Sequence, residues 1–191
     1  MKDVTSVTPQ PHQLRALAHP VRLRMLGLLR LNGPATSTML ATRLGLNTGA
    51  TSYHLRQLAQ HGFIVDDDSQ GNGRERWWKA AHQSTRTVSP PPDDVEGWEV
   101  TDAYLQTVAT IYTEWLQRAF EERPLLPLRW REAGTLSDYH QRLTPATATR
   151  LLERLDAILS EVEDEDDEDA ADFVVQLSAY VRPGQVSGDP S

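Results

Sequence analysis

Apolar residues in the first third of the chain recur every three or four positions, which is the period of an amphipathic helix. Proline and glycine interrupt this pattern where helices begin and end. Pro20 suits a first helical turn, and Gly45 and Gly62 suit positions just after a last turn. The pattern predicts four consecutive helices, over residues 10–18, 20–32, 37–44 and 48–61.

The period changes after the fourth helix. Residues 63–65 form a short apolar strand, residues 66–73 are polar and contain a Gly-Asn-Gly turn signal, and residues 74–80 return as a second strand. Because side chains alternate along a strand, we expect one of Trp77 and Trp78 to lie in the core. Helices, a tight turn, a further helix and a hairpin follow each other in the order of a winged helix-turn-helix.

A stretch with three consecutive prolines, residues 84–97, predicts an extended linker. It would separate a winged helix-turn-helix DNA-binding domain (residues 1–83) from a helical dimerisation domain (residues 98–191) that could also bind an effector. The predicted fold class is α+β and mostly α, with a two-stranded wing and a C-terminal helical region that ends in a strand.

The second domain is predicted to hold a long helix over residues 102–122, another that begins at Thr144-Pro145, and a strand over residues 173–181. The long helix carries an apolar seam spaced by three and four residues: Leu105, Val108, Tyr112, Trp115 and Ala119. We expect the seam to form a homodimer, because a two-fold protein suits palindromic half-sites. Packing within one chain is the alternative.

Aromatic side chains of the same domain could line a pocket for an effector, or build an ordinary core. They are Trp98, Tyr104, Tyr112, Trp115, Trp130 and Tyr139. The run of residues 161–169 has eight acidic residues out of nine and predicts a solvated loop.

The net charge of −8 is distributed unevenly along the chain. Residues 1–88 hold 11 basic and 5 acidic residues, whereas residues 89–191 hold 8 basic and 22 acidic ones. The first half is therefore the part expected to face a polyanion. The absence of cysteine excludes disulfides, thiolate metal sites and cysteine nucleophiles, and we predict neither a metal site nor a cofactor.

The chain is expected to be cytoplasmic. No apolar run approaches the roughly 18 residues of a membrane span, and the N-terminus lacks the pattern of a signal peptide.

The predicted fourth helix has an outer face without any carboxylate. Thr51, Leu55 and Leu58 form its inward stripe at spacings of four and three. The outer face offers hydroxyls, a bare glycine, one aromatic ring and one arginine, which suits the base edges and phosphates of a DNA major groove. Its residues are Thr48, Gly49, Ser52, Tyr53 and Arg56.

Two arginines of the wing, Arg74 and Arg76, could reach a neighbouring phosphate or enter a minor groove. We expect Glu75, between them, to face away from the DNA.

Four motifs occur in one order over roughly residues 10–82: LAHPVRLRML, TSTMLATRLGL, SYHLRQLAQHGFI and GRERWW. In this order they resemble the ArsR-type (arsenic-repressor-like) winged helix-turn-helix transcriptional regulators. The resemblance implies operator binding by a dimer. It assigns base contacts to Thr48, Gly49, Ser52 and Tyr53, and phosphate contacts to Arg56, Arg74 and Arg76.

The chain departs from the metal-sensing members of that family, which carry cysteines on the helix that corresponds to residues 37–44. Here the helix reads STMLATRL, so a thiolate sensor is excluded and an effector must be something else.

The sequence therefore predicts a transcriptional regulator, a dimeric repressor in particular. Its partners would be double-stranded DNA with a palindromic operator, a second copy of the chain, and an unknown small-molecule or protein effector. A protein-interaction adaptor that keeps the winged fold without binding DNA is the alternative. An enzyme is not expected, since no phosphate loop, Gly-x-Ser-x-Gly elbow or His-Glu-x-x-His motif is present.

Overall fold

The structure, a computed structural model, describes residues 5–69 and 75–186. The chain divides into an N-terminal unit, residues 2–135, and a C-terminal unit, residues 136–191. Each unit is described by itself.

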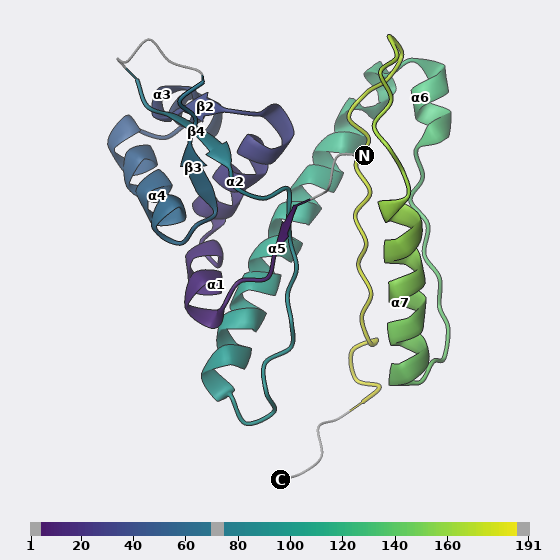
Figure 1. Cartoon of the computed structure of the whole chain (residues 1–191). Coiled ribbons are helices and arrows are strands. Elements are labelled where there is room, and N and C mark those ends of the chain that lie inside the picture. Colours follow the sequence, from purple (N-terminus) through teal and green to yellow (C-terminus); the bar gives the residue numbers. More distant parts are fainter. Residues whose placement is uncertain (1–4, 70–74, 187–191) are drawn as a thin grey trace. The chain divides into compact units, whose positions relative to one another are not determined.

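The first four helices of the N-terminal unit lie where the apolar pattern predicts them (Figure 1). The Asn47 side chain caps the fourth helix by accepting a hydrogen bond from the Ala50 N–H at 2.8 Å, and Gly45 ends the third with a φ of 64°. These residues fix the tight turn between the two helices. The helices are α1 (Pro11–Leu17), α2 (Pro20–Asn32), α3 (Ser37–Leu44) and α4 (Thr48–Gln60).

The predicted hairpin is present as β3 (Ile64–Asp66) and β4 (Trp77–Ala80), which pair antiparallel. A two-residue strand before α3, β2 (Ala35–Thr36), pairs with the other edge of β4. Trp78 is buried and Trp77 is half-buried, as expected for neighbours on a strand.

A second, parallel pair joins the beginning of the unit to the segment after the hairpin. It consists of β1 (Ser6–Val7) and β5 (Ser84–Thr85).

One hydrophobic core joins all four helices, the hairpin and the long helix that follows. Its fully buried members include Leu17, Met25, Leu26, Leu40, Leu55, Leu58, Phe63 and Ile64.

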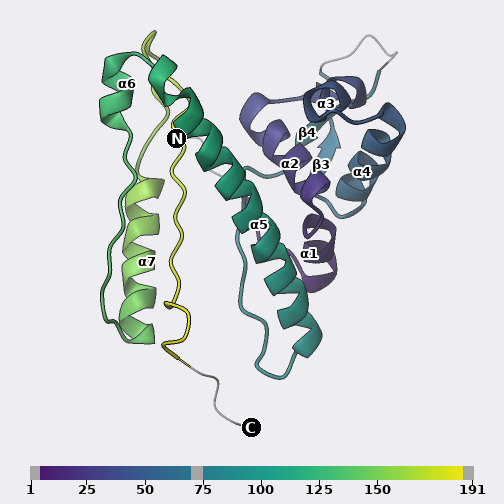
Figure 2. The same cartoon turned by 180° about the vertical axis from the view of Figure 1, so that it is seen from behind.

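The long helix α5 (Val95–Glu122) packs along α1 and α2 (Figure 2). It begins seven residues earlier than predicted, because the Asp94 carboxylate accepts a hydrogen bond from the Gly97 N–H at 2.9 Å and caps the first turn. The Thr107 hydroxyl donates to the Ala18 carbonyl at 3.1 Å, and Arg24 and Glu114 pair at 2.7 Å. A short 3-10 turn and a one-and-a-half-turn helix complete the unit: η1 (Arg123–Leu125) and α6 (Leu128–Ala133).

The chain therefore divides at a different place from the predicted linker. Residues 84–97 contain β5 and the start of α5, and α5 belongs to the same unit as the wing. The physical reason is that the inner face of α5, which includes Val100 and Tyr104, is buried in the core of that unit.

The C-terminal unit contains α7 (Pro145–Ser160), which begins as predicted with Thr144 as its cap. The predicted strand over residues 173–181 is wrong, because these residues have neither helical nor strand structure. A strand needs a neighbour to receive its backbone hydrogen bonds, and no strand is found among residues 136–186. No side chain of that range is fully buried.

The fold is α+β and mostly α, with an N-terminal winged helix-turn-helix. None of its helices, within the described residues, has the length and apolarity that crossing a membrane requires.

Candidate nucleic-acid interface

Helix α4 has one buried and one exposed face, as its pattern predicts. Thr51, Leu55 and Leu58 are each 0% exposed. On the opposite face Thr48, Gly49, Tyr53 and Arg56 are exposed, and Ser52 is half-buried. The packing of the inner face fixes the direction in which the outer side chains point.

Ser52 has a partner inside the protein. Its hydroxyl lies 2.8 Å from that of Ser37, the first residue of α3. This hydrogen bond joins the two helices of the helix-turn-helix beside the exposed face of α4.

Gly49 has a local structural reason to be a glycine. A Cβ atom there would lie 3.3 Å from Oδ1 of Asn47, the atom that caps α4. A larger residue would therefore crowd the cap, whether or not DNA comes close to this turn.

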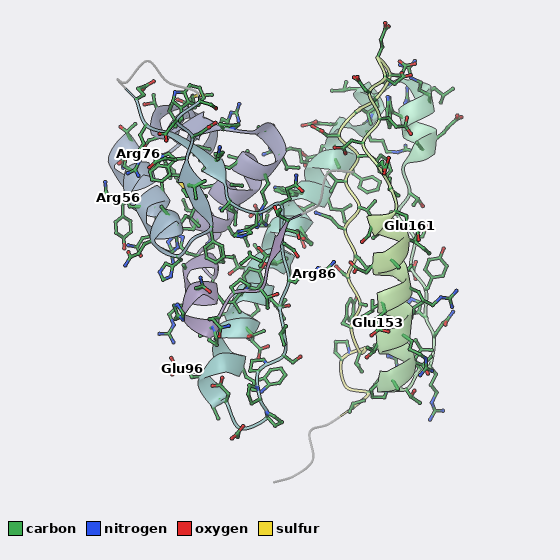
Figure 3. All side chains as sticks on the ribbon, in the orientation of Figure 1. Arg56, Arg76, Arg86, Glu96, Glu153 and Glu161 are labelled. Carbon is green, nitrogen blue, oxygen red and sulfur yellow. The ribbon has the colours of Figure 1, made fainter. Side chains whose placement is uncertain are left out.

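The two described arginines of the predicted site differ in their surroundings (Figure 3). The Arg76 guanidinium donates to both carboxylate oxygens of Asp66 and lies 4.1 Å from the centre of the Trp78 ring. The hydrogen bond to Asp66 raises the pKa of Arg76, and the same bond lowers the pKa of Asp66. Arg56 is exposed and has no hydrogen-bond or salt-bridge partner among residues 5–69 and 75–186. Arg56 is therefore the better-placed cation for a phosphate.

The third predicted arginine, Arg74, lies outside the described residues. Its neighbour Glu75 is described, and its carboxylate lies beside the start of α3. The Thr38 hydroxyl donates to Oε1 of Glu75 at 3.4 Å, which turns this carboxylate toward the start of α3.

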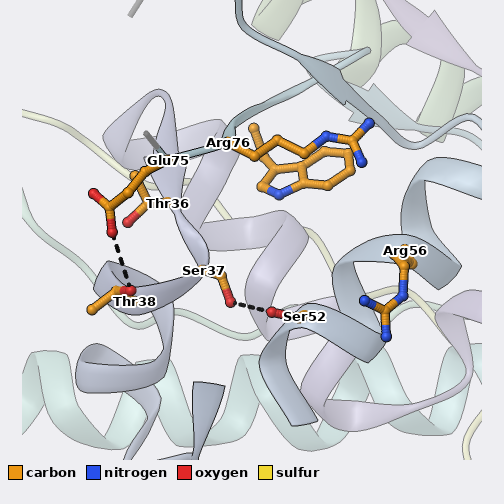
Figure 4. A pocket seen from close by; sticks show the side chains of 8 residues that line it. Thr36, Ser37, Thr38, Ser52, Arg56, Glu75 and Arg76 are labelled. Atoms are coloured by element: carbon orange, nitrogen blue, oxygen red, sulfur yellow. Dashed lines mark hydrogen bonds between the residues drawn. The ribbon is translucent and has the colours of Figure 1, made fainter. Parts of the chain in front are cut away.

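A hollow of about 260 Å³ lies between the start of α3, helix α4 and the wing (Figure 4). The sequence did not assign five of its residues to the site: Thr36, Ser37, Thr38, Glu75 and Trp78. The Thr-Ser-Thr run that begins α3 was the available signal, since three hydroxyls stand next to a predicted helix start. Its lining residues are Thr36, Ser37, Thr38, Ser52, Arg56, Glu75, Arg76 and Trp78.

Comparison with known protein families supports the helix-turn-helix assignment. Residues 17–66 match a family described as a helix-turn-helix domain. The match covers α2, α3 and α4, and therefore includes the exposed face of α4. Among curated proteins no match was found.

Three solved structures are similar to the chain, and two of them are described as transcriptional regulators. A possible transcriptional regulator for arsenical resistance is 23% identical, with a TM-score of 0.32, over 58% of this chain and 94% of that one. An apo mutant of ZitR from Lactococcus lactis is 13% identical, with a TM-score of 0.32, over 75% of this chain and 83% of that one. A transcriptional regulator from Thermotoga maritima is 12% identical (TM-score 0.30, over 74% of each chain). Likeness at these scores does not extend the function of any of them to this chain.

Two histidine rings lie close together, those of His19 at the start of α2 and His54 on α4. The rings of His19 and His54 are 4.7 Å apart, and the His19 Nδ1 accepts a hydrogen bond from the Val21 N–H. Burial and the nearby Arg22 guanidinium lower the pKa of His19; burial, His19 and Arg22 lower that of His54. The His54 Nδ1 has no hydrogen-bond partner among the described residues.

The predicted dimer seam on α5 is divided between two faces of the helix. Val108 packs against the core. The Trp115 ring lies next to Gly27 of α2, and a Cβ atom added to that glycine would be 3.4 Å from the ring. The other three seam residues, Leu105, Tyr112 and Ala119, are exposed. Five exposed apolar residues of this helix form what we call the α5 stripe: Trp98, Leu105, Tyr112, Leu116 and Phe120.

The aromatic residues that could line an effector pocket or build an ordinary core are distributed over both units. Tyr104 is buried in the core of the N-terminal unit, whereas Tyr139 belongs to the C-terminal unit and is 86% exposed. The described part of the chain contains no group of three or more His, Cys, Asp or Glu side chains that could hold a metal ion.

Proposed function

We propose that this protein is a sequence-specific transcriptional regulator of the ArsR type that binds a palindromic duplex as a homodimer and represses transcription. The observation that carries the proposal is the exposed, carboxylate-free face of α4. Arg56 would contact phosphate, and Thr48, Gly49, Ser52 and Tyr53 would face the base edges.

The electrostatics of this surface support a polyanionic partner. Arg56 is available for a phosphate, and Arg76 is held on the wing by Asp66 and Trp78. Arg74 completes the proposed phosphate group. Such contacts position a protein on the duplex, and base contacts then select the sequence.

The dimer is proposed to form through the α5 stripe. The stripe takes the place of the apolar seam that the sequence predicted as the dimer contact. Val108 and Trp115 are engaged within the N-terminal unit, so Leu105 and Tyr112 remain as the central apolar contacts with a second copy. A two-fold axis through α5 would relate two copies of α4, as a palindromic operator requires.

The absence of cysteine leaves a thiolate sensor without ligands. We therefore propose that any effector is not a metal bound by thiolates.

Selection from random-sequence duplexes tests the proposal. We expect one enriched palindrome, and we expect repression in vitro when that palindrome is placed within a promoter. Tyr53→Ala should change the preferred sequence, whereas the control Gln60→Ala, in the last turn of α4, should not. Failure to enrich any sequence would leave the adaptor as the better account.

A further inference from the structure

The hollow between α3, α4 and the wing contains two opposite charges that no described partner neutralises. Arg76 is paired with Asp66, whereas Arg56 has no partner among the described residues. The only carboxylate among the lining residues is Glu75, whose hydrogen bond is with the neutral Thr38 hydroxyl. Glu75 and Arg56 stand on opposite sides of the hollow and do not form a salt bridge (Figure 4).

The remaining lining groups are suited to an anion. Ser37, Thr38 and Ser52 supply hydroxyls, and hydroxyls are common donors to phosphate oxygens. A volume of about 260 Å³ leaves room for a phosphodiester group and several waters. Except for Glu75, the lining residues are neutral or positively charged.

We propose that this hollow receives one backbone phosphate of duplex DNA and that Glu75 limits how tightly the phosphate is held. The inference rests on the proposed DNA-binding function and names one contact within it. The hollow adjoins the exposed face of α4, so a duplex that lies on that face brings its backbone to the hollow. Glu75 then releases the Thr38 hydroxyl, which donates to the phosphate instead, while the Glu75 carboxylate stays beside the hollow and repels the phosphate.

Glu75 is in this account an affinity-setting residue. A carboxylate about 4 Å from a phosphate in water opposes binding by a factor of roughly five, and salt screens this repulsion. Glu75→Gln should therefore strengthen binding to any duplex about fivefold at low salt, and the gain should shrink as salt is added. Thr38→Val should weaken binding roughly tenfold or more, because a hydroxyl donor to a charged oxygen is lost.

Both variants have matched controls. Glu99→Gln makes the same charge change on an exposed position of α5, and Thr42→Val makes the same side-chain change one turn further along α3. Affinities of all five proteins for one random-sequence duplex would be measured by fluorescence anisotropy at several salt concentrations. We expect both controls to match the parent.

The outcomes separate this inference from the proposed function. A parent that binds no duplex overturns both. A parent that binds while Glu75→Gln behaves like Glu99→Gln, or binds more weakly than the parent, overturns the role of Glu75 alone.

A free anion is distinguished by NMR. The amide resonances of Ser37 and Thr38 should move with the duplex and not with millimolar inorganic phosphate at constant ionic strength. Saturation by inorganic phosphate would assign the hollow to a free anion and contradict the inference.

Discussion

The hydroxyls of Ser37 and Ser52 lie 2.8 Å apart, one on each helix of the helix-turn-helix. This contact gives Ser52 a structural role beside the proposed base-reading one. Helix α4 is fixed against α3 at a residue of its outer face, so the bond contributes to the orientation of the whole face.

The two roles of Ser52 can be separated by substitution. Ser37→Ala and Ser52→Ala should each lower the free energy of unfolding by about 1 kcal/mol, and the double variant should lose little more than either, because one hydrogen bond is removed in all three. Urea denaturation measures this. Only Ser52→Ala should also change the sequence preference; an equal change with Ser37→Ala would count against base reading by Ser52.

The contact between Gly27 of α2 and Trp115 of α5 predicts opposite effects of two substitutions. A Cβ atom at position 27 would lie 3.4 Å from the indole ring, an ordinary van der Waals contact. Gly27→Ala should therefore raise the free energy of unfolding by up to about 1 kcal/mol through helix propensity. Gly27→Leu should lower it by about 1–3 kcal/mol by overpacking against the ring.

Chemical denaturation of the two Gly27 variants tests this packing. Equal stability of the alanine and leucine variants would show that α5 does not pack on α2 at this point.

The histidine pair predicts a loss of stability in acid. The pKa values of His19 and His54 are lowered in the folded protein, chiefly by burial, from an ordinary value of 6.5. As the pH falls through 6.5 the unfolded chain takes up these protons first, so the contribution is complete above that pH and declines below it. Urea midpoints at pH 7.5 and 5.5 measure the decline.

Variants identify the source of that pH dependence. His54→Gln should reduce the difference between the two midpoints, because one of the two groups no longer titrates. The control Gln60→Ala, at an exposed position of α4 that carries no titratable group, should leave the difference unchanged. An unchanged difference in His54→Gln would show that this pair is not responsible.

If the protein dimerises through the α5 stripe, a single charged substitution within the stripe should weaken the dimer. Leu105→Arg places a charge among exposed apolar side chains and should raise the dimer dissociation constant by at least tenfold, since an unpaired charge at an interface is costly. Gln106→Arg, one residue further on and also exposed, is the control. Sedimentation equilibrium would show the effect, and a parent that is monomeric at all concentrations would contradict dimerisation.

The sequence predicted the helix-turn-helix and the wing well, because local chemistry determines them. Capping by Asn47, the positive φ of Gly45 and the inward stripe of α4 are each visible in the residues themselves. The elements that were predicted wrongly depend on contacts with distant parts of the chain. The apolar alternation of residues 173–181 resembles a strand, but it has no neighbour to pair with.

The same distinction applies to the candidate site. Three consecutive prolines predicted a linker at residues 84–97, so the cap at Asp94 and the early start of α5 were missed. The orientation of Glu75 depends on Thr38, which lies 37 residues earlier in the chain, and no local pattern predicts that contact. Exposure of Arg56 followed directly from helical periodicity.

The dependence of duplex affinity on salt concentration tests the central claim most directly. Parent, Arg56→Ala and the control Arg118→Ala, on an exposed position of α5, would be compared between 50 and 200 mM salt, roughly the range over which phosphate contacts are weakened. We predict a steep fall in affinity for the parent and for Arg118→Ala, and a slope about 0.9 smaller for Arg56→Ala, because one phosphate contact is lost. A parent that does not bind duplex DNA at 50 mM salt, or an Arg56→Ala slope equal to that of the control, would contradict the claim that the α4 face binds DNA.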